Sequence, residues 1–198
     1  RLVGSEMCIR DSNILLGFTG LLSFGHAAFL GMASYGSAHA AKVWGFTPEL
    51  AILFGTVVAM LLGIVIGMLT IRSRGIYFAN ITLAFAQMVF FFCLQAKFTG
   101  GEDGIQSVQR GKLFGLISLQ SDMVMYVFVA ILFFLTFLLI YRIIHSPFGQ
   151  VLRAVRENEA RATSLGYKVE HYKLAAFVLS ATLVGPVSYT HLTLPTKA

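Results

Sequence analysis

The chain has 198 residues, of which 57% are hydrophobic and only 12% are charged. Soluble domains carry about twice that charged fraction, so the composition excludes an ordinary soluble protein and indicates an integral membrane chain. The formal net charge of +6 would suggest a nucleic acid partner for a soluble protein. Here the basic residues mostly flank apolar runs, where membrane topology explains them better.

The two ends of the chain differ in character from the rest. Residues 1–12 and 187–198 interrupt the hydrophobic pattern abruptly and resemble translated adapter sequence of the kind found at the ends of assembled fragments. We therefore expect residues 13–186 to be the native part, a truncated interior portion of a longer membrane protein. Genuine polar tails are the alternative.

The first predicted span, residues 25–43, follows a glycine-rich lead-in over residues 13–24 and is rich in small residues. The pairs Ala27/Gly31 and Ser34/Ala38 have the four-residue spacing that lets membrane helices approach closely. This pattern predicts a helix in the middle of a bundle. Tight packing and the lining of a pathway are both compatible with it.

The next two spans are predicted at residues 50–71 and 76–96, separated by a short basic loop. The first is charge-free and long enough to cross a bilayer, and Gly63 and Gly67 predict a close helix contact within it. The second carries Asn80 and Gln87 on one face and Thr82 off that line. Polar groups in hydrocarbon need partners or water, so a translocation path and hydrogen bonds between helices both remain open.

A long loop, residues 97–122, precedes a charge-free span at 123–141, and a last span begins at residue 174. The loop opens with Thr99-Gly-Gly-Glu-Asp-Gly104, which lacks the spacing of a calcium loop. Gly111-Lys112 lacks the rest of a phosphate-binding loop, so the chain has no such device for ATP. Cys8 and Cys93 have no metal-ligand spacing and give no disulfide framework.

The polar stretch at residues 145–167 has the pattern of an amphipathic helix, or of two helices with a bend. Ser146 and Pro147 are typical of a helix start, with the serine hydroxyl as N-cap, and Gly166 of a helix end. One face is apolar and the opposite face is charged. The apolar face consists of Phe148, Val151, Leu152, Val155 and Ala162, and the charged face of Arg153, Glu157 and Arg161, with Arg156 on the flank.

The stretch SPFGQVLRAVRENEARATSLGY resembles the cytoplasmic coupling segment of permease subunits of bacterial ABC importers, in the branched-chain amino acid branch. The general importer pattern is Glu-Ala-Ala, three residues, then Gly. Here Glu159-Ala160-Arg161 is followed by Gly166 one position later, which leaves the anchor residue open. Four other segments resemble the same family in the same order, and together they cover about residues 13–186: GFTGLLSFGHAAFLG (17–31), RGIYFANITLAFAQM (74–88), TGGEDGI (99–105) and YKLAAFVLSATLVG (172–185).

The resemblance implies an all-α, polytopic transmembrane helix bundle with a cytoplasmic amphipathic coupling helix, in the bacterial inner membrane. It implies transport of branched-chain amino acids driven by separate ATP-binding cassette ATPase subunits. Further implied partners are a second permease subunit, a periplasmic substrate-binding protein and the lipid bilayer, without nucleic acid. No catalytic residue, metal or cofactor is implied. The residues expected to contact the ATPase are Arg153, Arg156, Glu157, Glu159, Ala160 and Gly166.

Candidates for a substrate path are the polar residues Ser23, His26, Asn80 and Thr82. For His26, a structural role in capping or bridging helices is the favoured interpretation. The expected substrate is a branched-chain amino acid, and urea or another small solute of the same family is the alternative. A secondary transporter or channel is disfavoured, because spans 50–71, 76–96 and 123–141 contain no Asp, Glu or His.

Orientation follows from the basic residues alone. If residues 145–168 lie on the cytoplasmic side (inside), the alternation of spans also places residues 72–75 inside. Residues 42–49 and 97–122 then lie on the opposite side of the membrane (outside). Inside loops and flanks then hold more lysine and arginine than outside loops, as the positive-inside rule requires. The inside set is Arg72, Arg74, Arg142, Arg153, Arg156, Arg161, Lys168 and Lys173, and the outside set is Lys42, Lys97, Arg110 and Lys112.

Overall fold

The computed structural model describes residues 17, 23, 25–45, 47–73, 75–96, 112–113, 117–118 and 122–193. Residues 1–12 and the Thr99–Gly104 motif lie outside this part. The described elements are α2 (His26–Lys42), α3 (Pro48–Thr70), α4 (Ile76–Gln95), β1 (Lys112–Leu113), β2 (Ile117–Ser118), α5 (Asp122–Ile144), α6 (Pro147–Glu157), α7 (Glu159–Ser164) and α8 (Val169–Thr193). The predicted all-α transmembrane bundle is confirmed, with one minimal antiparallel hairpin of β1 and β2.

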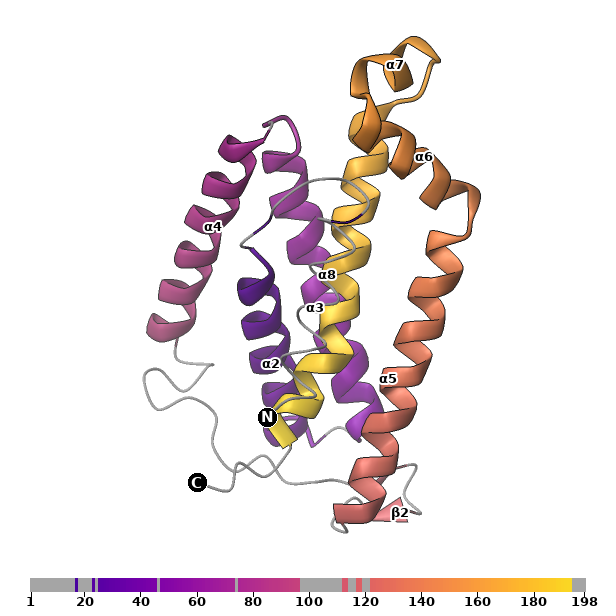
Figure 1. Ribbon diagram of the computed structural model, residues 1–198. Coiled ribbons are helices and arrows are strands. Elements are labelled where there is room, and N and C mark those ends of the chain that lie inside the picture. The colour runs from indigo at the N-terminus through magenta and orange to yellow at the C-terminus, as the bar shows by residue number, and fades with distance from the viewer. Residues whose placement is uncertain are drawn as a thin grey trace.

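Three helices, α2, α3 and α8, form the centre of the bundle, and α4 and α5 flank it on opposite sides (Figure 1). The largest buried cluster joins α2, α3, α4 and α8 and includes Phe29, Phe78 and Phe177. The Phe177 ring meets Phe29 and Phe78 edge to face, with ring centroids 5.5 and 5.9 Å apart. Such aromatic contacts add packing specificity to the apolar burial and fix these four helices together.

Glycines set the spacing between the central helices. A Cβ atom on Gly63 would lie 2.7 Å from the Cβ of Ala181, and one on Gly67 would lie 2.7 Å from Leu174 Cδ1. The predicted close contact at Gly63 and Gly67 is therefore confirmed, and its partner is α8. Between α2 and α3 the close approach is at Gly55, where a Cβ would lie 3.0 Å from the Ala33 carbonyl oxygen.

The Ala27/Gly31 spacing does not mark such a contact. Ala27 is exposed, and a Cβ on Gly31 would meet no atom within 4 Å. Both residues instead line a cavity of about 200 Å³ between α2 and α4. The central position predicted for α2 holds, but only some of its small residues serve close packing.

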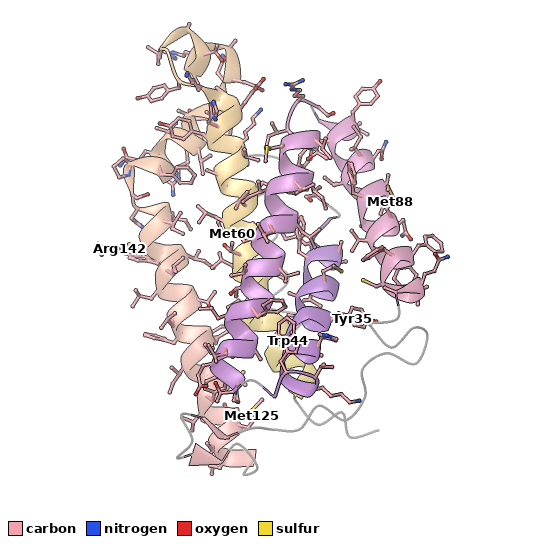
Figure 2. All side chains as sticks on the ribbon, turned by 180° about the vertical axis from the view of Figure 1, so that it is seen from behind. Tyr35, Trp44, Met60, Met88, Met125 and Arg142 are labelled. Atoms are coloured by element: carbon pink, nitrogen blue, oxygen red, sulfur yellow. The ribbon has the colours of Figure 1, made fainter. Side chains whose placement is uncertain are left out.

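The arrangement of the helix ends matches the predicted alternation of loops. Figure 1 shows α6, α7 and the turn between α3 and α4 at one end of the bundle, and β2 at the other. Figure 2 likewise shows Arg142 toward the α6 end of α5, and Trp44 and Met125 toward the opposite end. Within the described part of the chain, α3, α4 and α5 are each long and apolar enough to span a membrane.

The last helix differs from the prediction at both ends. It begins at Val169, five residues before the predicted start, and therefore includes Lys173. The lysine is accommodated because its ammonium group has an ion-pair partner. At the other end α8 continues through Pro186 to Thr193, past the expected native boundary at residue 186. Which residues near the ends are native stays a prediction.

Candidate coupling segment and substrate path

The turn from α5 into α6 is built on Ser146, Pro147 and Gly149. Ser146 is extended and Pro147 opens α6, as predicted. The predicted hydroxyl N-cap is wrong, because the Ser146 hydroxyl donates to the Ile143 carbonyl oxygen at 2.6 Å and so completes the end of α5. The sharp turn keeps this side chain beside the last carbonyls of α5, which have no partner within their own helix.

Gly149 makes the sharpness of that turn possible. A Cβ atom on this residue would lie 2.2 Å from the Ile144 carbonyl oxygen and 2.8 Å from its carbonyl carbon. Backbone atoms cannot rotate away as a flexible side chain can. Gly149 carries a signal in the sequence, because glycine inside a helix, where alanine is the better helix former, indicates a special requirement.

The predicted apolar face of the segment is confirmed, and it packs on its own chain. Val155 of α6, Ala162 of α7 and Val169 of α8 are buried together, with Val151 against them. Leu152 is also buried and lines a small apolar cavity with residues of α5 and α8. The two short helices α6 and α7, with the residue between them (147–164, called the α6–α7 unit below), are therefore attached to the membrane helices.

Asn158 divides the unit into two helices. Its backbone is extended, with φ −154° and ψ 98°, and its side-chain oxygen accepts a hydrogen bond from the Arg161 N–H at 3.0 Å. Asparagine is among the strongest N-cap residues, because its side chain satisfies an N–H group that the first helical turn leaves open. Of the two forms left open by the sequence, the structure contains the bent pair.

The predicted ATPase-contact residues lie mainly on the outer surface of the unit. Arg153, Arg156, Glu157 and Ala160 are exposed. The Arg156 guanidinium also donates to the Gly17 carbonyl oxygen. Gly166 is exposed as well and has φ +87°, a left-handed conformation that favours glycine and ends α7 as predicted.

Glu159 is placed differently from the other predicted contact residues. Its carboxylate oxygen Oε2 lies 2.9 Å from the Lys173 ammonium nitrogen, and the two side chains are 33% and 10% exposed, respectively. In the sequence, Lys173 is recognisable only as a positive charge that flanks a membrane span. The helical phase of α8 could have placed it among buried residues, but no sequence pattern indicated Glu159 as its partner.

Three of the four candidate substrate-path residues gather at the start of α2. The Ser23 hydroxyl accepts a hydrogen bond from the Gly25 N–H at 3.2 Å, and a Cβ on Gly25 would lie 3.6 Å from Thr82 Cβ. His26 Nε2 lies 2.7 Å from the Ser180 hydroxyl oxygen of α8. This bond bridges two helices, which agrees with the structural role favoured for His26 and adds Ser180 to the group.

Asn80 does not join this group. It is exposed whereas Thr82, two residues later on α4, is fully buried. The Thr82 hydroxyl bonds within its own helix, to the Ala79 carbonyl oxygen at 2.9 Å. Gln87, on the same face as Asn80, lines the cavity between α2 and α4. The polar residues of α4 therefore lie in at least two different environments.

Comparison with known proteins places this chain in a family. The family described as "Branched-chain amino acid transport system / permease component" matches residues 12–189. The chain belongs to this family. The permease is similar to the high-affinity branched-chain amino acid transport system permease proteins LivM of Escherichia coli (strain K12) and Salmonella typhimurium. Each is 28% identical over 196 residues, covering 87% of this chain and 46% of the relative.

The permease thus spans about half the length of the curated relatives it matches. No solved structure shows significant similarity to it. The apolar helices and the family together establish a membrane protein of the permease type.

Proposed function

We propose that this permease is part of the membrane-spanning subunit of an ABC importer for branched-chain amino acids, driven by ATP hydrolysis on separate ATPase subunits. The observation that carries the proposal is the α6–α7 unit. Its apolar face is buried on the permease's own helices, and its charged face is exposed at the end of the molecule where basic residues gather. Such a unit can receive a soluble partner and pass force to the membrane helices.

The ATPase contact in this proposal is made by Arg153, Arg156, Glu157, Ala160 and Gly166. Each exposed charge pair contributes only modestly to affinity, so the charges set partner choice and register more than strength. Glu159 contributes at the edge of this surface, because its carboxylate is partly occupied by Lys173.

The substrate path in this proposal passes the group of Ser23, His26, Thr82 and Ser180. Hydroxyl and imidazole groups can hydrogen-bond the carboxylate or ammonium group of an amino acid. The surrounding Phe29, Phe78 and Phe177 suit an aliphatic side chain. Asn80 faces outward on α4, where it contributes through a second permease subunit.

The proposal assigns the remaining partners to the other surfaces of the permease. A substrate-binding protein docks at the β1–β2 end, on the periplasmic side of the bacterial inner membrane. The exposed apolar faces of α4 and α5, which include Phe91 and Phe134, meet lipid or the second permease subunit.

Substrate uptake tests the proposal. The complete permease that contains this sequence is expressed with its neighbouring transporter genes in cells lacking branched-chain amino acid uptake, and radiolabelled leucine and urea are offered. We expect leucine uptake that unlabelled isoleucine and valine compete. Urea uptake without leucine uptake would replace the amino acid assignment, and uptake that survives removal of the ATPase genes would exclude the importer mechanism.

A further inference from the structure

An ion pair between a nearly buried lysine and a half-buried glutamate joins the α6–α7 unit to α8. Lys173 Nζ and Glu159 Oε2 are 2.9 Å apart, and the lysine side chain is only 10% exposed. Burying an ammonium group is unfavourable unless a charged partner offsets the lost hydration, and a buried pair seldom adds much net stability. A role in holding α7 in one position on α8 explains the pair better than stability does.

The same face of α8 carries the contacts that reach into the membrane. Lys173, Phe177 and Ser180 follow one another at intervals of four and three residues and therefore share a helix face. Phe177 is fully buried against Phe29 and Phe78, and Ser180 bonds His26 at 2.7 Å. Further along, Ser188 donates to the Leu30 carbonyl oxygen at 2.9 Å. One side of α8 thus connects α7 at one end with α2 along the rest.

Close packing on α3 holds α8 as a stiff element. Besides the contacts at Gly63 and Gly67, a Cβ on Gly185 would lie 2.5 Å from the Thr56 Cα atom. Helices packed this closely move together or rearrange as a whole, because a close-packed protein interior has low compressibility and transmits the displacement of one helix to its neighbours. A displacement of α7 would therefore reach Ser180 and His26 through α8.

We propose that the Glu159–Lys173 ion pair is the tie that makes the α6–α7 unit and α8 move together. Lys173 is then a positioning residue for transport, acting through α8 on the Ser180–His26 bond. This inference rests on the proposed function and adds to it the route by which a movement imposed on the unit reaches the substrate path.

The test uses charge exchange in the complete transporter, reconstituted in proteoliposomes with its ATPase, second permease and binding protein. The variants are Glu159→Lys, Lys173→Glu, the double exchange, and the uncharged Glu159→Gln. Glu170→Gln, an exposed acidic residue near the start of α8, is the matched control. Leucine uptake and ATP hydrolysis are measured on the same vesicles, and ATPase recovery is measured on the purified complexes.

We expect each single variant to lower the leucine transported per ATP hydrolysed by about tenfold, within the range of coupling energies between neighbouring charged groups. The ratio is compared at equal ATPase recovery, because Glu159 also lies at the edge of the proposed ATPase surface. The double exchange should restore most of the ratio that the single variants lose, and Glu170→Gln should transport within about twofold of the wild type, as expected for an independent site. If Lys173 had only a structural role, its replacement would instead lower the protein yield without changing the ratio of uptake to hydrolysis.

Two outcomes would overturn this inference and leave the proposed function standing. One is an unchanged ratio of uptake to hydrolysis in Glu159→Gln, which decides the question even if the charge reversals do not insert into the membrane. The other is a double exchange that assembles with the ATPase yet remains as uncoupled as the single variants. A wild-type permease that carries no ATPase would instead overturn the proposed function, and the inference with it.

Discussion

At the scale of single residues, Asn158 decides the shape of the α6–α7 unit. Its side chain caps α7 while its backbone ends α6, so one residue makes a bend that alanine would not favour. The bend brings Ala162 of α7 onto Val155 and Val169, and it brings Glu159 within reach of Lys173.

Replacing Asn158 tests this cap. Asn158→Ala should lower the stability of the permease by about 1 kcal/mol, the usual cost of losing an N-cap side chain. Asn158→Asp, which keeps an acceptor at the same position, should stay close to the wild type. Thermal unfolding of the purified permease in detergent measures both, and equal midpoints for the alanine variant and the wild type would show that the cap has no energetic role.

Ser180 tests the bridge between α8 and α2. Ser180→Ala removes the hydroxyl that lies 2.7 Å from His26, and leaving a buried polar group without its partner costs about 1–3 kcal/mol. Thr182→Ala is the control, because the Thr182 hydroxyl donates within its own helix, to the Leu179 carbonyl oxygen. A larger loss of thermal stability in Thr182→Ala than in Ser180→Ala would contradict the bridge.

At the scale of helices, glycine position matters more than glycine spacing. Gly63 and Gly67 face α8 at contact distance, whereas Gly31 faces open space. The pair Ala27/Gly31 nevertheless has the same four-residue spacing as the pair Gly63/Gly67. The four-residue spacing indicates that two small residues share a helix face, but it does not indicate whether another helix lies against that face.

Alanine substitutions at Gly63 and Gly31 separate these cases. Gly63→Ala would press against the Ala181 Cβ at 2.7 Å, which cannot rotate away, so we expect a loss of about 1–3 kcal/mol from overpacking. Gly31→Ala meets nothing and should be neutral or slightly stabilising, because alanine is the better helix former. Thermal unfolding midpoints compare the two, and a stable Gly63→Ala variant would contradict the close packing of α3 on α8.

Most helix positions could be predicted from the sequence, because long apolar runs bounded by charges or glycine leave few alternatives in a membrane. The start of α8 could not, since Lys173 looks like a residue outside the membrane until its partner is known. That partner, Glu159, lies on another helix, and periodicity within one segment cannot indicate a contact between two. For the same reason Ser23, His26 and Thr82 were found as polar residues, but Ser180 was missed.

At the scale of the whole molecule, the positions of the helix ends and of the basic residues predict one orientation in the membrane. The α6–α7 unit and the turn between α3 and α4 lie at one end of the bundle. Among the described residues, Arg72, Arg142, Arg153, Arg161 and Lys168 belong to these turns and helices or flank them. By the positive-inside rule, we therefore expect this end to lie in the cytoplasm.

Site-directed labelling tests this orientation in a background without Cys8 and Cys93. Val43→Cys, at a residue that is 62% exposed at the end of α2, should react with a membrane-impermeant maleimide in intact cells. Arg161→Cys, on the exposed face of α7, should react only after the inner membrane is permeabilised. The reverse pattern would invert the topology and remove the cytoplasmic assignment of the α6–α7 unit.

The central claim is that the α6–α7 unit is the docking site of an ATPase, and affinity co-purification tests it most directly. The complete permease is purified from membranes as the wild type and as the variant Arg153→Glu/Glu157→Lys. We expect the ATPase to accompany the wild type and its recovery to fall by about tenfold in the variant, because reversed charges repel a complementary surface. A wild type without ATPase, or equal recovery with both proteins, would contradict the claim.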